Sequence, residues 1–176
     1  MKEIFLIHNR PWTVREVVAV VILLIIVTVG LIWLYRKKRI VLSQVIASEL
    51  LVVFLAIVLA STVFTRTPNG VHDYELLPFW SWREVIAGDR LMLEEILLNM
   101  ILLTPAGFLL PFVFNKRIVW YKVFLMGVGF STLIEVSQLL LCRGLFEWDD
   151  ILHNALGAMA GCGVAERLFG RLIFEQ

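Results

Sequence analysis

Charged residues are scarce in this chain. Only 18% of its 176 residues are charged, whereas a soluble domain has about a quarter, and 60% are hydrophobic. One small core cannot bury that much apolar surface, so the composition predicts lipid as the solvent. The net charge of +1 gives no reason to expect a nucleic acid as a partner.

Familiar catalytic and metal-binding motifs are also absent from the sequence. It has no Gly-rich phosphate loop, no G-x-S-x-G elbow and no H-E-x-x-H. Cys142 and Cys162 form no C-x-x-C pair and no metal-ligand spacing, so we expect free thiols. A metal site built from Asp149, Asp150 and His153 would match no strong motif. The sequence therefore predicts neither a cofactor nor a metal.

Long apolar stretches are what the sequence has in abundance. A helix of roughly 18 to 25 residues is about 27–37 Å long, enough to cross a hydrocarbon core of about 30 Å. The sequence thus predicts an all-α polytopic membrane helix bundle of about five transmembrane helices. The five stretches are Val17–Leu34, Ile40–Phe64, Ile96–Phe114, Val123–Cys142 and Ile151–Phe169.

Basic residues indicate how the bundle is inserted. The run Arg36–Arg39 directly follows the first stretch, which is typical of a stop-transfer flank rather than a cleaved secretion signal. If the N-terminus is outside, the basic residues of the inner side lie in much shorter segments than those of the outer side. We therefore expect the N-terminus outside and the C-terminus inside.

The connection Thr65–Glu95 is the longest in the chain. It carries two tryptophans beside a proline, a composition suited to the membrane interface. Ser81 and Glu84 form a capping-box pattern, so the sequence predicts a short interfacial helix over Trp82–Ala87 that ends at Gly88. We interpret this connection as a membrane-anchoring loop, with a substrate lid as the alternative.

Polar residues inside the last three apolar stretches share one side of the membrane. They fall at the start of the third, the end of the fourth and the start of the fifth, and successive helices run in opposite directions. Spacings of three or four place each pair on one face of its helix. In the expected orientation their side is extracytoplasmic. The pairs are Glu95 and Asn99, Glu135 and Gln138, and Asp150 and Asn154.

These residues are expensive to place in lipid. A charge at mid-bilayer costs on the order of 3 kcal/mol, so their convergence favours a functional site over simple interhelical contacts. Arg143 could neutralise Glu135 or Asp150, with Asp150 the nearer of the two, or it could bind a phosphate. Gly157 and Gly161 form a G-x-x-x-G stripe that would allow close helix packing. Glu49, deeper in the second stretch, could be an interhelical contact.

Several short motifs in the last two thirds of the chain occur in a specific order and spacing. They are Leu76-Leu77-Pro78-Phe79, Asn99 with Leu103-Thr104-Pro105-Ala106-Gly107-Phe108, Ser131-Thr132-Leu133-Ile134-Glu135-Val136-Ser137-Gln138, Arg143, and Asp150-Ile151-Leu152-His153-Asn154-Ala155-Leu156-Gly157-Ala158. Together they resemble the VanZ-like family. Thr104 departs from the aromatic or aliphatic residue expected before the proline.

The resemblance implies a bacterial membrane protein and a link to low-level resistance to the glycopeptide teicoplanin. It divides the chain into an N-terminal helix pair (1–64), a VanZ-like domain (65–168) and a short tail (169–176). The family's motif positions carry over onto Asn99, Glu135, Gln138, Arg143, Asp150 and Asn154.

Two functions follow from these expectations. The first is a non-enzymatic membrane module that binds a membrane lipid or a lipid-linked cell-wall precursor at the outer leaflet. The alternative is a membrane-embedded enzyme acting on a lipid headgroup, in which Glu135 and Asp150 form a general acid and base pair. A channel or transporter is disfavoured, because few polar residues occupy the inner half of the bundle.

Overall fold

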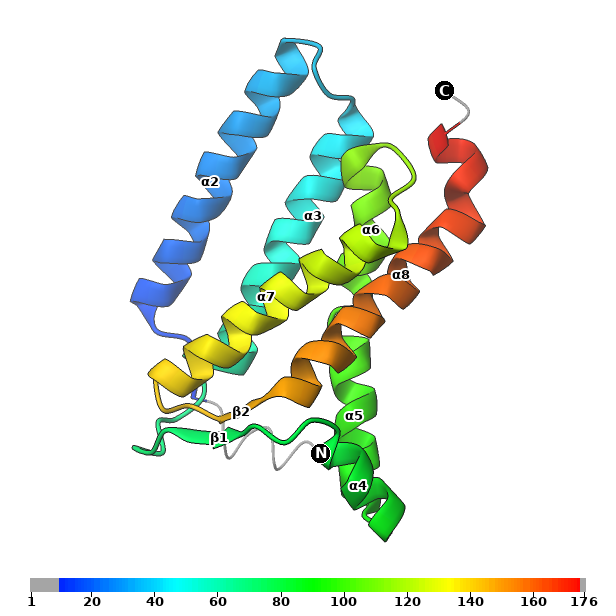
Figure 1. Cartoon of the computed structure of the whole chain (residues 1–176). Coiled ribbons are helices and arrows are strands. Elements are labelled where there is room, and N and C mark those ends of the chain that lie inside the picture. Colours follow the sequence, from blue (N-terminus) through cyan, green and yellow to red (C-terminus); the bar gives the residue numbers. More distant parts are fainter. Residues whose placement is uncertain (1–9, 175–176) are drawn as a thin grey trace.

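A bundle of long helices makes up most of the computed structural model, which describes residues 10–174 (Figure 1). Within these residues, four helical segments are long and apolar enough to cross a membrane. This confirms the prediction of an all-α helical membrane protein. The segments are α2 (Val14–Arg36), α3 (Leu42–Leu59) continued by the π-helix η1 (Ala60–Phe64), α5 (Arg90–Leu102) with α6 (Thr104–Phe114), and α7 (Trp120–Leu140).

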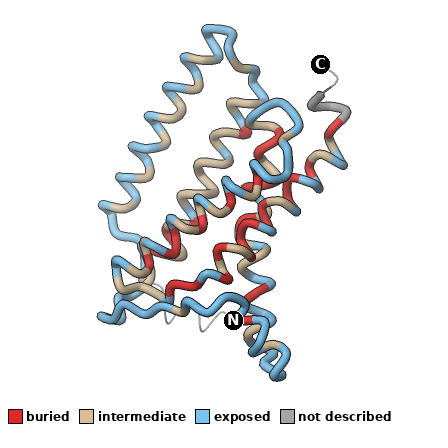
Figure 2. Tube along the Cα trace, in the orientation of Figure 1, coloured by how far each residue is buried: buried red, intermediate tan, exposed pale blue. Residues whose placement is uncertain are grey.

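The fifth expected span corresponds to α8 (Trp148–Phe174). It is long enough to cross a bilayer, but it is not among the segments that are sufficiently apolar. The reason lies in its position: α8 packs against α5, α6 and α7, and buried residues are concentrated along it (Figure 2). A helix that faces other helices needs less lipid-compatible surface. Five spans therefore remain a prediction, and the expected tail is helical as far as Phe174.

Helix α2 lies at the edge of the bundle and packs mainly against α3 (Figure 1). It begins with a capping box in which the Thr13 hydroxyl accepts from the Glu16 amide and the Glu16 carboxylate accepts from the Thr13 amide. None of its residues is buried within the protein. Its apolar surface is therefore left for lipid.

The third apolar stretch is broken between α5 and α6. Pro105 in the first turn of α6 cannot donate a helical hydrogen bond, so α5 ends at Leu102 and a new helix begins at Thr104. The Thr104 hydroxyl lies 2.8 Å from the Met100 carbonyl oxygen and 3.2 Å from that of Gly157 on α8. Thr104, the one departure from the family pattern, thus links the break to the central helix.

Glycines bring α8 into backbone contact with α5 and α6. A Cβ atom at Gly157 would lie 1.7 Å from the Met100 carbonyl oxygen, and one at Gly161 would lie 2.0 Å from that of Thr104. A Cβ atom at Gly107 on α6 would lie 1.9 Å from the Ala158 carbonyl oxygen. No side chain fits at these positions, so the G-x-x-x-G stripe packs against α5 and α6 rather than lipid.

A short helix and a two-stranded sheet close one end of the bundle. Helix α4 (Trp80–Ala87) ends at Gly88, whose φ of 105° suits glycine, as expected. Strands β1 (Asp73–Glu75) and β2 (Leu145–Glu147) pair in parallel. The sequence analysis missed this sheet, because three-residue strands carry too little periodicity to detect.

The predicted capping box at Ser81 is wrong. Helix α4 starts at Trp80, so Ser81 lies within its first turn rather than before it. Instead of capping with Glu84, the Ser81 amide and hydroxyl both donate to the Asp149 carboxylate, at 3.1 and 2.6 Å. The Phe79 amide donates to the same carboxylate at 2.7 Å. A buried acid at the start of α8 therefore supplies the N-terminal cap of α4.

Candidate polar binding site

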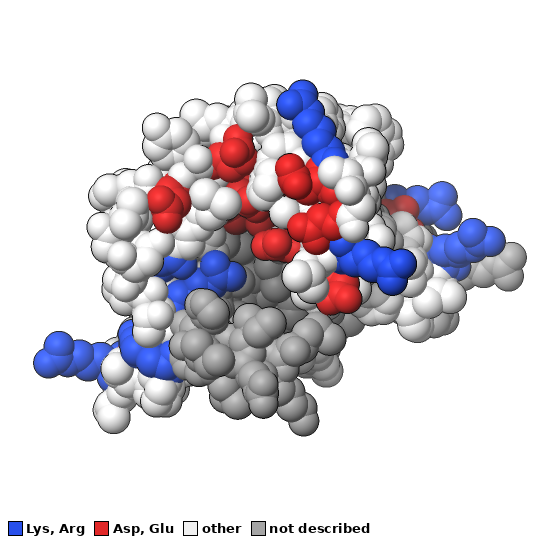
Figure 3. Space-filling model, turned by 90° about the horizontal axis from the view of Figure 1, so that it is seen from below, with Lys and Arg blue, Asp and Glu red and all other residues white. Residues whose placement is uncertain are grey.

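A polar cavity of about 200 Å³ lies at the end of the bundle that carries α4 and the small sheet. Figure 3 looks onto this end, where acidic side chains gather next to a smaller group of basic ones. Six elements (η1, α4, α5, α7, β2 and α8) and the segment that follows η1 supply the walls. The lining residues are Thr62, Arg66, Trp80, Glu95, Asn99, Leu102, Ile134, Glu135, Gln138, Leu145, Glu147, Asp150 and Asn154.

Five of the six residues singled out from the sequence line this cavity. They come from α5, α7 and α8, whose antiparallel order brings their polar ends together. Glu95, one turn before Asn99 on α5, lies at the same place. The five are Asn99, Glu135, Gln138, Asp150 and Asn154.

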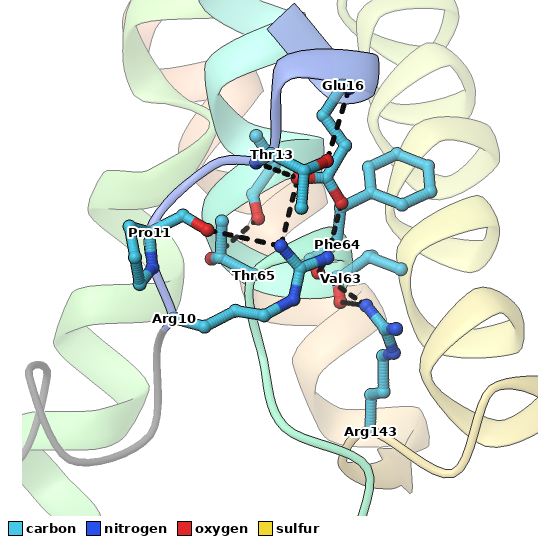
Figure 4. Close-up of polar contacts among 9 residues, drawn as sticks. Arg10, Pro11, Thr13, Glu16, Val63, Phe64, Thr65 and Arg143 are labelled. Atoms are coloured by element: carbon cyan, nitrogen blue, oxygen red, sulfur yellow. Dashed lines mark hydrogen bonds and ion pairs between the residues drawn. The ribbon is translucent and has the colours of Figure 1, made fainter.

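Arg143, the sixth residue, points elsewhere. Its Nη1 donates to the Val63 carbonyl oxygen at 3.0 Å and to the Phe64 carbonyl oxygen (Figure 4). The expected direct pairing with Asp150 is therefore wrong. Carbonyl groups at the end of η1 have no amide of a following turn to accept from, and a cation satisfies them well.

Arg66 takes the place that Arg143 was expected to fill. It lines the cavity and is close enough to Glu135 and Asp150 to interact electrostatically with both. A Cβ atom at Gly144 would lie 3.0 Å from its Nη1, so the glycine leaves room for the guanidinium. The sequence signal for Arg66 was its position directly after the second apolar stretch, at the same end as the other polar residues.

Three of the cavity's polar side chains also hold the fold together. The Gln138 amide donates to the Thr62 carbonyl oxygen at 3.0 Å, which joins α7 to η1. Glu135 accepts from the Glu147 amide at 3.2 Å, which joins α7 to β2. The Asn154 amide donates to the Ser131 hydroxyl at 2.8 Å, which joins α8 to α7.

Other polar atoms at the cavity have no hydrogen-bond partner within residues 10–174. They are Asn154 Oδ1 and Trp80 Nε1, and the Asn154 side chain is only 1% exposed. A buried polar group without a partner costs about 1–3 kcal/mol. Because these polar atoms lie beside a cavity, they indicate a binding site for a polar ligand.

Carboxyl groups dominate the electrostatics of the cavity. Burial raises the pKa of Glu147 to about 8, and nearby Asp150, Glu95 and Glu135 raise it further, as does a side-chain hydrogen bond with Asp150. Among the lining residues, these four carboxyl groups face the single guanidinium of Arg66. Near neutral pH the group can therefore hold at least one proton.

A family comparison covers almost the whole of this architecture. The VanZ/LLP1 family model matches residues 17–170. The chain belongs to the VanZ/LLP1 family. The match includes α2 and α3, which the motif resemblance had left outside. Searches of curated proteins and of solved structures returned no match.

In this VanZ/LLP1 protein, Asp149 and His153 form hydrogen bonds with α4 and do not line the cavity. Asp149 caps the helix, and His153 Nε2 accepts from Trp82 Nε1 at 3.0 Å. Asp150, between them in sequence, lines the cavity instead. Within the part of the chain that the structure describes, no group of three or more His, Cys, Asp or Glu residues could hold a metal ion.

Glu49 lies outside the cavity of this VanZ/LLP1 protein. The Thr28 hydroxyl donates to Glu49 Oε1 at 2.7 Å and so joins α2 to α3. The interhelical contact expected of Glu49 from the sequence thus has a specific partner.

Proposed function

We propose that this VanZ/LLP1 protein binds the polar headgroup of a membrane lipid, or of a lipid-linked cell-envelope precursor, in the cavity at the α4 end. The observation that carries the proposal is the buried Asn154 amide with its unpartnered Oδ1, set among four carboxyl groups in a cavity. Polar groups at this depth of a membrane bundle tend to mark function.

The surroundings of the cavity support a ligand from the membrane interface. Helix α4 is exposed on its apolar side, with Ile86 85% and Trp82 41% accessible. Tryptophan next to aliphatic residues is typical of a segment that rests at the level of the lipid headgroups. A lipid headgroup would therefore reach the cavity without leaving the membrane surface.

The size and charge of the cavity limit the kinds of ligand that can bind in it. Its volume of about 200 Å³ lies below the roughly 300–1,000 Å³ of pockets that enclose drug-sized ligands. Four carboxyl groups against one guanidinium favour a hydrogen-bond donor such as an ammonium or hydroxyl group over a phosphate. The cavity thus suits the terminal group of a headgroup rather than a whole saccharide.

The cellular setting belongs to the same proposal. With the basic segments inside, the cavity faces the extracytoplasmic side of a bacterial membrane. Glycopeptides act at that surface, so occupancy of the cavity by an envelope lipid would connect the protein to teicoplanin-type resistance.

Lipid binding by the purified, detergent-solubilised protein tests the proposal. Native mass spectrometry would be run with phosphatidylethanolamine, phosphatidylglycerol and an isoprenoid-linked disaccharide precursor. We expect one of them to bind, and Glu147→Gln with Asp150→Asn to weaken it about tenfold or more, a change of about 1.4 kcal/mol. Glu84→Gln removes an exposed carboxylate at the same end and should change nothing. Equal binding in all variants would refute the proposal.

An enzyme acting on a lipid headgroup is the second candidate. One observation favours it: Glu147 has a pKa of about 8 and shares a hydrogen bond with Asp150, so a proton donor and a proton acceptor lie side by side. Incubation with headgroup-labelled phospholipid, followed by chromatography, distinguishes the two. Product that appears with wild type and not with Glu147→Gln establishes an enzyme, and intact lipid in both supports binding alone.

A further inference from the structure

A second hollow lies at the same end of the bundle, between α2 and α3. It is an apolar groove of about 260 Å³. Ala19 on α2 and Ala56 and Ala60 on α3 and η1 line it, and their small side chains leave a gap that larger ones would fill. Leu23 and Phe64 provide further apolar wall. Its dimensions and lining suit a hydrocarbon chain.

The groove and the polar cavity lie on two sides of one helical turn. In η1, Ala60 and Phe64 line the groove, while Thr62 lines the cavity. A helix with its side chains is about 10–12 Å across, so only this short distance separates the two hollows. A single amphiphile could therefore occupy both.

Arginines surround the end of this turn. Arg10 donates to the Phe64 carbonyl oxygen at 2.9 Å and pairs with Glu16, which lines the groove (Figure 4). Arg143 binds the carbonyl oxygens of Val63 and Phe64 from the other side. Together with Arg66, which lines the cavity, they place cations between the apolar groove and the acidic cavity. Guanidinium groups suit a phosphate in this position.

From this order of charges we infer that the ligand is a diacyl aminophospholipid that spans both hollows. One acyl chain lies in the α2–α3 groove, the phosphate lies beside the arginines, and the ammonium group enters the acidic cavity. The inference rests on the proposed function, because the headgroup must occupy the cavity. It adds the class of lipid and the groove in which one of its acyl chains binds.

Blocking the groove separates chain binding from headgroup binding. Ala56→Trp would fill the groove, whereas Ile57→Trp, at the next residue, places the same side chain on a lipid-exposed surface. The probes are dioleoyl phosphatidylethanolamine, the same headgroup with six-carbon chains, and dioleoyl phosphatidylglycerol. They are compared by native mass spectrometry on the full chain, with Tm as the measure of folding.

For Ala56→Trp, we expect affinity for the long-chain ethanolamine lipid to fall about tenfold or more, because the indole ring would occupy the space of the acyl chain. Short-chain binding should persist in every variant, and Ile57→Trp should match wild type. Phosphatidylglycerol should bind more weakly than its ethanolamine counterpart. If Ala56→Trp does not fold, Ala19→Trp fills the groove from the loosely packed α2.

Two failures can be told apart. If the short-chain ethanolamine lipid does not bind wild type, the proposed headgroup site fails. If it binds, but both tryptophan substitutions in the groove leave long-chain affinity unchanged, the chain site fails and the headgroup site stands. Equal or tighter binding of phosphatidylglycerol overturns the aminophospholipid assignment.

Discussion

Some polar residues of the cavity form hydrogen bonds within the fold, and others have polar atoms that remain available to a ligand. The side chains of Gln138 and Glu135 form hydrogen bonds to η1 and β2, respectively. Asn154 does both, because its amide nitrogen binds Ser131 while its oxygen has no partner within residues 10–174. Substitutions at Gln138 would therefore disturb folding and binding together, whereas Glu147 and Asp150 are the better positions for testing binding.

Glu147 makes the stability of the protein depend on pH. Burial and neighbouring carboxylates raise its pKa from 4.5 to about 8, so the folded state favours the protonated form. The stabilisation is complete below pH 4.5 and is lost as pH rises through 8. We expect Tm in detergent to fall between about pH 5 and pH 9, measured by differential scanning fluorimetry.

Glu147→Gln should flatten this profile, because glutamine imitates the protonated acid at every pH. At pH 9 the variant should therefore be more stable than wild type, whereas Glu84→Gln should follow the wild-type curve. A Tm of wild type that rises with pH would contradict the assignment.

Gly161 and Gly163 offer a matched test of helix packing on α8. A Cβ atom at Gly161 would lie 2.0 Å from the Thr104 carbonyl oxygen, while one at Gly163 would meet nothing within 4 Å. Gly161→Ala should destabilise the protein by about 1–3 kcal/mol, the usual cost of overpacking. Gly163→Ala should be neutral or stabilising, because alanine favours the helix by up to about 1 kcal/mol. Equal melting temperatures of the two variants in detergent would show that α8 packs less closely against α6 than the structure indicates.

At the scale of elements, the sequence predicted the features that local patterns such as long apolar runs determine. The spanning helices, the end of α4 at Gly88 and the shared side of the polar pairs all follow from local patterns. The β1–β2 pairing and the Asp149 cap of α4 do not, because each depends on segments far apart in sequence. The choice between Arg66 and Arg143 has the same cause, since linear spacing does not say which way a loop side chain points.

One buried carboxylate caps helix α4 and, together with the Trp82–His153 hydrogen bond, holds it to the bundle. Asp149 is fully buried and accepts from the Phe79 amide and from the Ser81 amide and hydroxyl. Asp149→Ala leaves buried donors without an acceptor, and we expect a loss on the order of 3 kcal/mol confined largely to α4. Hydrogen exchange should rise over residues 79–88 and stay slow in α7. Asp149→Asn, which keeps one acceptor oxygen, should give an intermediate rise, and a uniform rise along the chain would argue against a local anchor.

At the scale of the whole molecule, the two ends of the bundle differ in charge and in structure. One end carries the short loops with Arg36–Arg39 and with Lys116 and Arg117, and the other carries α4, the sheet and the acidic cavity (Figure 1). By the positive-inside rule, short basic segments favour the cytoplasmic side, so we propose that the basic end is cytoplasmic. The polar cavity and the basic loops therefore lie on opposite sides of the membrane.

The orientation can be measured with single cysteines at the two ends. In a variant with Cys142 and Cys162 replaced by serine, Lys37→Cys reports on the basic end and Glu84→Cys on exposed α4. Moving the lysine and arginine cluster across the membrane would be strongly unfavourable, at about 2.5–3.5 kcal/mol for each such residue at the helix centre. A membrane-impermeant maleimide should therefore label position 84 in intact cells and position 37 only after permeabilisation. Labelling of position 37 with protection of position 84 would reverse the orientation and place the cavity on the cytoplasmic side, where a ligand of the outer leaflet could not reach it.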